Sequence, residues 1–196
     1  MTSEEDLIVR ARELEARALG EIYDVYSPAL YRYAVRLLGG ADLAEECVAE
    51  VFSRFLHALR AGKGPQDSLQ AYLYRVAHNW ITDQWRRRPP AALELEEAQC
   101  TDEKGDPSRS LLEQMEQLEV RAALAKLTPD QRQVITLKYL EGLENEQIAA
   151  ALSKPVGAVK SLQHRGLAAL RRALLRKAES QAEPQAEPKK EFNEFV

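Results

Sequence analysis

The sequence has little of what a metal site, a disulfide framework or a membrane segment requires. It contains two cysteines and three histidines, and neither Cys47 nor Cys100 has a metal-ligand neighbour at a useful spacing. No apolar run approaches the roughly 20 residues that cross a bilayer, and nothing resembles a signal peptide. We therefore expect a cytoplasmic protein with no metal, no cofactor and no membrane insertion, in which Cys47 is a small core residue.

Glycine and proline are also scarce, and alternating strand patterns are almost absent. The chain has nine of each in 196 residues, and its long segments carry apolar residues at helical spacing. A hydrophobic share of 45% permits cores of modest size. We predict an all-α protein with two small helical domains, at 1–88 and 113–177. An acidic, flexible linker at 89–112 joins them, and a disordered tail follows at 178–196.

The charges are distributed unevenly along the chain. The formal net charge is −4, which by itself does not suit a nucleic-acid partner. However, residues 154–177 contain seven basic and no acidic side chains, whereas residues 91–119 contain nine acidic and two basic ones. This asymmetry is more informative than the total charge, and it leaves DNA binding open for the basic segment.

The segment from Leu127 to Lys177 has the pattern of a helix-turn-helix. Thr128-Pro129-Asp130-Gln131 is typical of a helix start, with Thr128 as the cap and Gln131 as its capping-box partner. Further helices are expected at 144–152 and 156–177, separated by a short break. A basic second helix after a tight turn favours reading of the DNA major groove. The alternative is a solvated helix whose basic end complements its own dipole, but this leaves Lys160 and Arg165 unexplained.

The helix expected from Asp42 to about Leu59 carries acids beside an apolar stripe. Asp42, which we expect to cap this helix, is followed by Glu45, Glu46 and Glu50, with no basic residue among them. Acidic residues near a helix N-terminus favour the helix dipole. Four of them on one helix also make an acidic docking face. The residues alone support the two interpretations equally.

The helix expected from Ser68, its cap, to about Arg88 collects aromatic and basic residues, including both tryptophans of the chain. Aromatic rings interleaved with basic side chains suit stacking on unpaired nucleotides and neutralisation of phosphates. Alternatively, some of the rings belong to the core. Tyr72, Val76 and Trp80 are spaced for an inward stripe, and we expect at least one of them to be buried.

Together, these segments resemble a sigma factor of the sigma-70 family, in the extracytoplasmic-function group, over about residues 20–88 and 115–177. Each matching fragment is weak alone, but the ordered set is specific. The fragments are 42–52, 71–79 with Asp83 and Arg86-Arg87, 127–135, 139–142, 146–149, 156–161 and His164-Arg165.

The resemblance implies partners and contact residues rather than an active site, so we expect no enzyme. The partners would be promoter DNA, core RNA polymerase and, in regulated relatives, an anti-sigma factor. The acidic helix would dock on the β′ coiled coil through Asp42, Glu45, Glu46, Val48 and Phe52, and the helix-turn-helix would also dock on the β flap. The minus-ten element would be bound and opened by Tyr72, Tyr74, Arg75, Asn79, Trp80, Asp83, Arg86 and Arg87. The minus-thirty-five element would be read by Lys160, Ser161, Gln163, His164 and Arg165.

Two departures from the family pattern affect the second half. Ser153 occupies the turn where many relatives have glycine, which makes a positive φ more costly. Residues 161–164 are Ser-Leu-Gln-His where Ser-Arg-Leu-His is common, so that Gln163 would substitute by reading adenine. The main alternative is a stand-alone helix-turn-helix regulator, which predicts duplex binding without polymerase and gives the aromatic segment no role.

Overall fold

The computed structural model describes residues 4–66, 68–87 and 120–182. All regular structure within these ranges is helical, which agrees with the predicted all-α class. None of these helices is long and apolar enough to cross a membrane. The linker predicted at 89–112, Cys100 and residues 183–196 lie outside the described residues. The tail predicted to begin at 178 starts too early, because residues 178–182 continue the last described helix.

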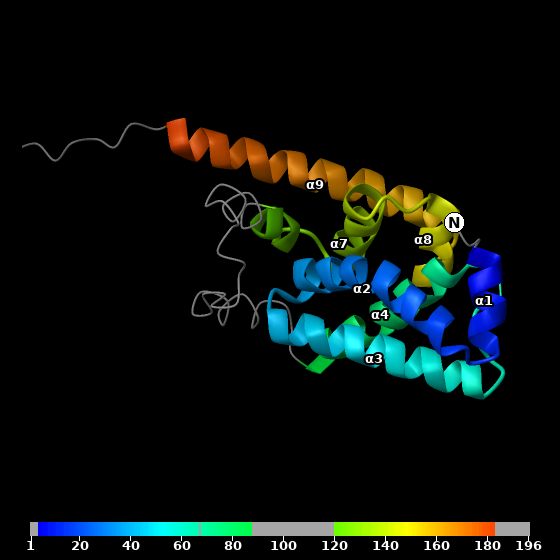
Figure 1. Cartoon of the computed structure of the whole chain (residues 1–196). Coiled ribbons are helices and arrows are strands. Elements are labelled where there is room, and N and C mark those ends of the chain that lie inside the picture. Colours follow the sequence, from blue (N-terminus) through cyan, green and yellow to red (C-terminus); the bar gives the residue numbers. More distant parts are fainter. Residues whose placement is uncertain (1–3, 67, 88–119, 183–196) are drawn as a thin grey trace, which may run out of the picture.

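The helices follow one another in two halves (Figure 1). The first half contains α1 (Glu4–Arg12), α2 (Ala16–Leu38), α3 (Ala41–Arg60) and α4 (Leu69–Arg87). The second half contains a helical stretch at 120–125, α7 (Pro129–Ile135), the π-helical turn η1 (Thr136–Leu140), α8 (Asn145–Leu152) and α9 (Val156–Ala182).

Several helix ends lie where the local sequence predicts them. Thr128 and Gln131 form the expected capping box at the start of α7, with Pro129 in the first turn. The Ala71 N–H donates to the Ser68 hydroxyl at 3.2 Å, so Ser68 caps α4. Gly39 ends α2 with a φ of 87°, a conformation that favours glycine, and its N–H donates to the Val35 carbonyl.

The prediction that Asp42 caps α3 is wrong. The N-cap is Gly40, which has an extended backbone and lies two residues before Asp42, and no side-chain cap bond is formed there. Asp42 therefore lies in the first turn, where its charge favours the helix dipole without bonding the free amides.

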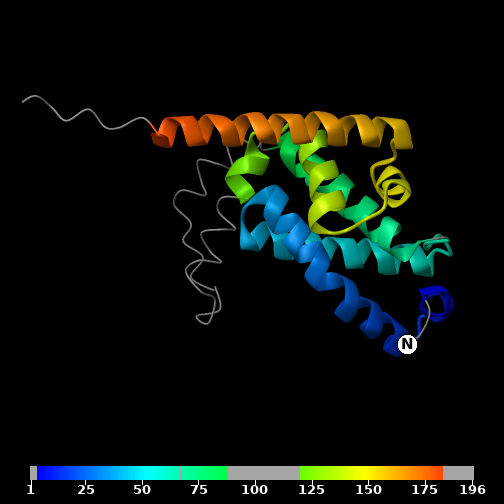
Figure 2. The same ribbon diagram turned by 90° about the horizontal axis from the view of Figure 1, so that it is seen from above.

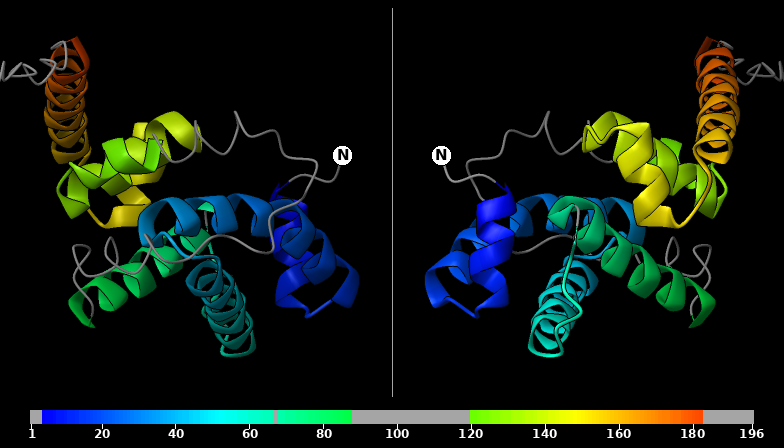
Figure 3. Two further views of the ribbon diagram at one scale, coloured as in Figure 1. Left: turned by 90° about the vertical axis from the view of Figure 1, so that its left-hand side faces the viewer. Right: turned by 90° about the vertical axis from the view of Figure 1, so that its right-hand side faces the viewer.

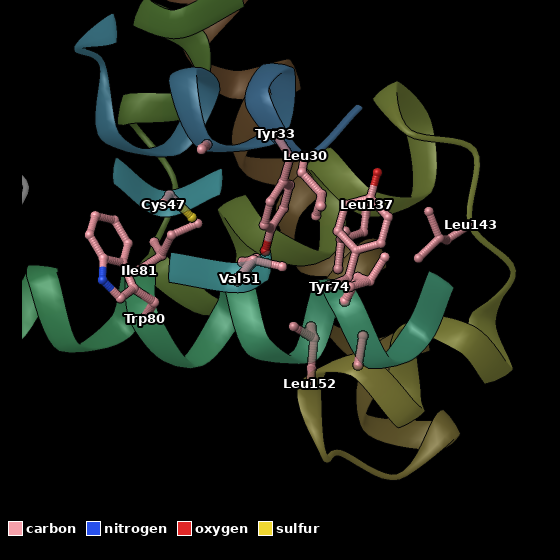
Figure 4. Close-up of a cluster of buried hydrophobic side chains, with 14 of the residues drawn as sticks. Leu30, Tyr33, Cys47, Val51, Tyr74, Trp80, Ile81, Leu137, Leu143 and Leu152 are labelled. Carbon is pink, nitrogen blue, oxygen red and sulfur yellow. The ribbon is translucent and has the colours of Figure 1, made fainter. Parts of the chain in front are cut away.

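The first half is held by apolar faces of α2, α3 and α4 that converge on one core (Figure 4). Tyr33 and Leu30 of α2 meet Cys47 and Val51 of α3 and Ile81 of α4, and all five side chains are buried. α1 packs against α2, and it also reaches α4, because the Glu4 carboxylate accepts from the Leu69 N–H at 2.6 Å.

The second half packs directly on the first, with α8 lying along α4 (Figure 3). Leu137, Leu143 and Leu152 of the second half approach Tyr74 of α4 (Figure 4). One continuous cluster includes most buried residues of both halves, although we expected each half to bury its own modest core. A separate small cluster in the second half contains Leu124, Leu127 and Ile135. Helical periodicity identifies the apolar stripe of a helix but not the partner that covers it. α9 extends along one edge of the assembly (Figure 2).

The turn between α8 and α9 stores a small amount of backbone strain. Ser153 ends α8 with φ 52° and ψ 42°, the left-handed region that glycine adopts more easily. The Lys154 N–H still donates to the Ala149 carbonyl at 3.0 Å, which closes the last turn. Ser153 therefore adopts the positive φ that the departure from glycine makes more costly.

We expect Ser153→Gly to stabilise the protein. Relief of the left-handed conformation outweighs the greater backbone entropy of glycine in the unfolded chain, for a net gain of about 0.5–1 kcal/mol. Urea unfolding followed by circular dichroism measures this gain. The matched control is Ala150→Gly on α8, where glycine lowers stability by about 1 kcal/mol. Loss of stability in both variants would contradict the argument.

We expect Cys47 to be inert in the native state. Its side chain is fully buried, and burial raises the pKa of the thiol to about 12, so the reactive thiolate is scarce at neutral pH. In a Cys100→Ser variant, labelling by a thiol reagent should therefore be slow in buffer and rapid in concentrated urea. Rapid labelling of the folded protein would show that α2 and α4 do not cover this position of α3.

Candidate nucleic-acid interface

α9 has one face that packs and one face that is free to bind. Val159 and Leu162 are buried against the second half, and Gly166 lies on the same side. A Cβ placed on Gly166 would lie 2.8 Å from Cγ1 of Ile135, which is too close for an unperturbed contact. Glycine at this position therefore lets the buried face of α9 pack directly against α7.

The opposite face of α9 presents four of the five residues predicted to read DNA. Lys160, Ser161, His164 and Arg165 are exposed. The Ser161 hydroxyl donates to the Gly157 carbonyl at 3.0 Å, and Arg165 Nε donates to the Ser161 carbonyl at 3.3 Å. These bonds hold both side chains along the helix, while two cationic or protonatable groups flank them. The resulting surface offers the hydrogen-bonding groups and the positive charge that a helix needs to read the DNA major groove.

Gln163, the fifth predicted reader, is half-buried and already has a partner. Its Nε2 donates to Oδ1 of Asn145 at 2.6 Å, across the turn from the first residue of α8. The amide that we expected to read adenine is therefore held by the protein in this arrangement. Sequence reasoning missed Asn145, because the two residues are 18 positions apart and neither belongs to a recognisable pair motif.

The turn itself is tied to α7 by charge. Lys154 Nζ lies 3.0 Å from the Asp130 carboxylate. Lys154 is one of the seven basic side chains at 154–177, and its pairing with Asp130 connects the turn to α7. An exposed ion pair adds little stability, so the contact mainly fixes the position of the turn.

α4 presents a second polar surface. Arg75, Asn79, Asp83, Arg86 and Arg87 are exposed along it, as predicted for DNA contacts. Arg86 and Asp83 lie 3.3 Å apart and orient one another. Basic side chains along one helix suit contacts to DNA phosphates, and an amide beside them suits contacts to the edges of nucleobases.

Tyr72 connects this polar surface to the core. Its ring is half-buried, with the guanidinium of Arg75 lying 5.3 Å from the ring centroid and Phe55 packing at 6.0 Å behind it. An aromatic ring with a cation over one face is a suitable platform for a stacked base.

Tyr74 and Trp80 do not belong to the exposed DNA-facing surface predicted for them. Tyr74 is 1% exposed and packs edge-on against Tyr33 at 5.2 Å between centroids. Burial raises the pKa of the Tyr74 hydroxyl, which donates to the Glu141 carboxylate at 3.4 Å. Trp80 is buried, as the inward-stripe interpretation allowed, and Trp85 is buried as well. The spacing of these rings fits a core stripe and a DNA-facing surface equally well, so the sequence alone could not assign them to the core.

The acidic face of α3 adjoins a groove, which Glu45 lines. Asp42, Glu45 and Glu46 are exposed, as an acidic docking face requires. The predicted contacts Val48 and Phe52 are 7% and 9% exposed, so they support this face more than they form its surface. Tyr23 of α2, which the sequence did not single out, stacks on Phe52 at 4.8 Å and remains half exposed.

The groove itself has a volume of about 990 Å³ and runs between α2 and α3. Tyr23, Val35, Val48 and Ala49 line its apolar part, and Arg32 and Arg36 stand opposite Glu45. Val120, Arg121 and Leu140 of the second half close one side of it. The site therefore includes surfaces from both halves. Among the described residues, no group of three or more histidines, cysteines or carboxylates is placed to hold a metal.

Two protein-family models match the chain in the same two halves. Residues 22–89 match sigma-70 region 2, which covers most of α2, α3 and α4. Residues 117–170 match sigma-70 region 4, which covers α7, α8 and the start of α9. Each exposed surface described above therefore lies in a matched region.

The curated relatives carry consistent names. The chain is 34% identical to the ECF RNA polymerase sigma factor SigL of Mycobacterium tuberculosis, over 84% of this chain and 93% of that protein. It is 31% identical to the ECF RNA polymerase sigma factor BldN of Streptomyces coelicolor, over 86% of this chain and 65% of that protein. Identity to SigX of Bacillus subtilis is 28%, over 77% and 80% of the two chains.

Solved structures with the same fold include two proteins that are each in complex with a partner protein. CnrH in complex with the cytosolic domain of CnrY aligns with a TM-score of 0.68 at 26% identity, over 87% of this chain and 96% of that one. RpoE of Bartonella quintana, in complex with the anti-sigma factor NepR, aligns with a TM-score of 0.60 at 24% identity, over 79% and 95%. The chain belongs to the extracytoplasmic-function group of the sigma-70 family of RNA polymerase sigma factors.

Proposed function

We propose that this protein binds core RNA polymerase, brings it to specific promoters and helps to open the DNA there, without catalysis of its own. The observation that carries this proposal is the presence of two separate basic, DNA-compatible faces, on α9 and α4, in a chain that also bears an exposed acidic face on α3. A stand-alone helix-turn-helix regulator would need the first of these alone.

In this proposal α9 fixes the upstream position of the complex. Lys160 and Arg165 neutralise phosphates, and His164 and Ser161 reach base edges in the major groove. Asn145 holds Gln163 and so restricts which base contacts Gln163 can make. The buried seat of α9 on α7 keeps the reading face in a fixed orientation.

α4 acts downstream, where the strands separate. Arg75, Arg86 and Arg87 follow the backbone of the displaced strand, and Tyr72 offers its ring to an unstacked base. Extrusion of a base costs a few kcal/mol, and stacking on an aromatic ring contributes about 1–3 kcal/mol per base toward that cost. Exposed polar residues such as Asn79 supply the hydrogen bonds that distinguish bases.

The groove between α2 and α3 receives the partner protein. Asp42, Glu45 and Glu46 face basic groups of the polymerase β′ coiled coil, while Tyr23 supplies an aromatic anchor beside them. The first helices of the second half contact the β flap. An anti-sigma protein competes for the same groove. This part of the proposal draws on two proteins of the same fold that were solved with a partner, CnrH with the cytosolic domain of CnrY and RpoE with the anti-sigma factor NepR.

Run-off transcription on a defined promoter tests the function as a whole. Core polymerase should start at that promoter when the purified protein is added and should fail to start without it. If the protein instead binds the duplex tightly alone and leaves polymerase specificity unchanged, the stand-alone regulator is the correct assignment.

We expect the double substitution Lys160→Ala and Arg165→Ala to weaken binding of the holoenzyme to the upstream element. Log affinity falls as log salt concentration rises, and each lost phosphate contact should make this fall shallower by about 0.9 in slope. Fluorescence anisotropy at a series of salt concentrations measures this slope.

Arg17→Ala with Arg60→Ala is the matched control, because it removes two exposed charges on α2 and α3, outside the half that contains α9. An equal change of slope in this control would show that net charge, and not the α9 face, determines binding.

We expect Glu45→Lys with Glu46→Lys to weaken binding to core polymerase by about tenfold, or about 1.4 kcal/mol, because like charges then meet in the interface. Titration of core with dye-labelled protein measures this affinity. Glu5→Lys with Glu13→Lys makes the same charge change at exposed positions in and after α1 and should leave the affinity unaltered. Unchanged affinity in the α3 variant would remove α3 from the docking face.

A further inference from the structure

Glu141 is a buried carboxylate that joins the two halves of the chain. It follows η1 in the second half, yet its side chain is 2% exposed and faces α2 and α4 of the first half. Arg36 Nη1 donates to one of its oxygens, while Tyr74 donates to the other at 3.4 Å and Arg32 lies 3.9 Å away. A buried charge is costly unless it is paired and hydrogen-bonded, and all three partners here come from the other half.

The surrounding contacts extend this junction along α4. Gln147 of α8 donates to the Gln70 side chain at 3.1 Å, and the guanidinium of Arg132 lies 5.9 Å from the ring centroid of Trp85. Leu152 of α8 belongs to the continuous apolar cluster that also contains Tyr74. The junction therefore combines apolar burial, which is not specific for one partner, with a charged contact that fixes the register.

The joined arrangement is too small to bind both promoter elements. A compact chain of 196 residues has a radius of gyration of about 16 Å. Elements centred near minus ten and minus thirty-five are separated by about 25 base pairs, or roughly 85 Å of duplex at about 3.4 Å per pair. Residues 88–119 join the halves, and 32 residues of chain can span up to roughly 105 Å. The covalent connection therefore permits a separation that the junction prevents.

The junction also restricts access to the polymerase groove. Leu140, the residue before Glu141, lines one side of the groove between α2 and α3, together with Val120 and Arg121. Arg32 and Arg36 line the same groove and bind Glu141. Opening the junction would release both arginines and uncover the side of the groove that the second half closes.

We propose that Glu141, with Arg36 and Tyr74, forms a latch that keeps the free protein closed, and that this latch opens when the protein binds polymerase and promoter. The regulatory part of this inference rests on the proposed sigma function. The existence of the latch does not, because it concerns the free chain.

Charge reversal is a cleaner test than pH. Burial raises the pKa of Glu141 despite Arg36 and Arg32, so Glu141 stabilises the closed form more at low pH and less as the carboxyl ionises. Burial lowers the pKa of His78, which faces Gln133 with Lys154 and Asp130 nearby, so this group favours the closed form more at high pH. The two effects oppose each other, and a pH titration would mix them.

The latch is tested in the free protein by energy transfer between dyes on Asp24→Cys of α2 and Ala168→Cys of α9. Both positions are exposed, and the background is Cys100→Ser with Cys47 buried. The unaltered latch should give high transfer. Glu141→Lys or Arg36→Glu alone should lower the transfer, because like charges then meet in a buried site, and the two changes together should restore most of it.

Lys138→Glu is the matched control. Lys138 pairs with Glu144 at 2.9 Å inside the second half, so its reversal breaks an ion pair close to Glu141 without touching the junction. High transfer in both single latch variants, an equal loss in Lys138→Glu, or low transfer in the unaltered protein would each overturn the latch. Circular dichroism confirms that each variant remains helical, and Arg36→Glu tests the latch without altering the second half.

The regulatory claim has its own readout. If the open form makes up roughly one tenth of the free chain, Glu141→Lys should bind core polymerase about tenfold more tightly. Lys138→Glu should not. Reduced energy transfer without tighter binding would overturn the inhibitory role while leaving the latch in place. Failure of every variant, and of the unaltered protein, to support transcription would count against the proposed function and not against the latch.

Discussion

The structure depends on the burial of α4 from two sides. α2 and α3 cover one side of this helix, and α8 covers another, so most of its apolar and aromatic residues are buried, with Tyr72 and Val76 half-buried. Burial of large aromatic side chains is the strongest contribution to a helical core of this size. α4 thereby becomes the main element through which the two family-matched regions contact one another, in addition to carrying the surface for which we propose DNA contacts.

Local signals in the sequence predicted local structure well. Thr128 with Gln131, Ser68 and Gly39 each mark a helix end through bonds within a few residues, so the pattern and the structure agree. The exposed positions of α9 were also predictable, because helical spacing separates Lys160 and His164 from Val159 and Leu162.

Long-range partners were not predictable in the same way. Tyr74 and Trp80 lie on a helix whose aromatic residues suit either a core or a stacking surface, and composition does not distinguish the two. Glu141 had no special status in the sequence, because its partners Arg36 and Tyr74 are 105 and 67 residues away. A buried charge is recognised by what surrounds it, and that information exists only after the chain has folded.

The separation of the two faces of α9 has a consequence for how this protein can diversify. The residues that hold the helix in place, such as Val159 and the close contact of Gly166 with Ile135, are not those that face outward. If α9 reads the promoter as we propose, substitutions at Lys160 or His164 can change the preferred promoter with little effect on folding. Duplicated copies of such a gene can acquire separate sets of target genes while keeping the same scaffold.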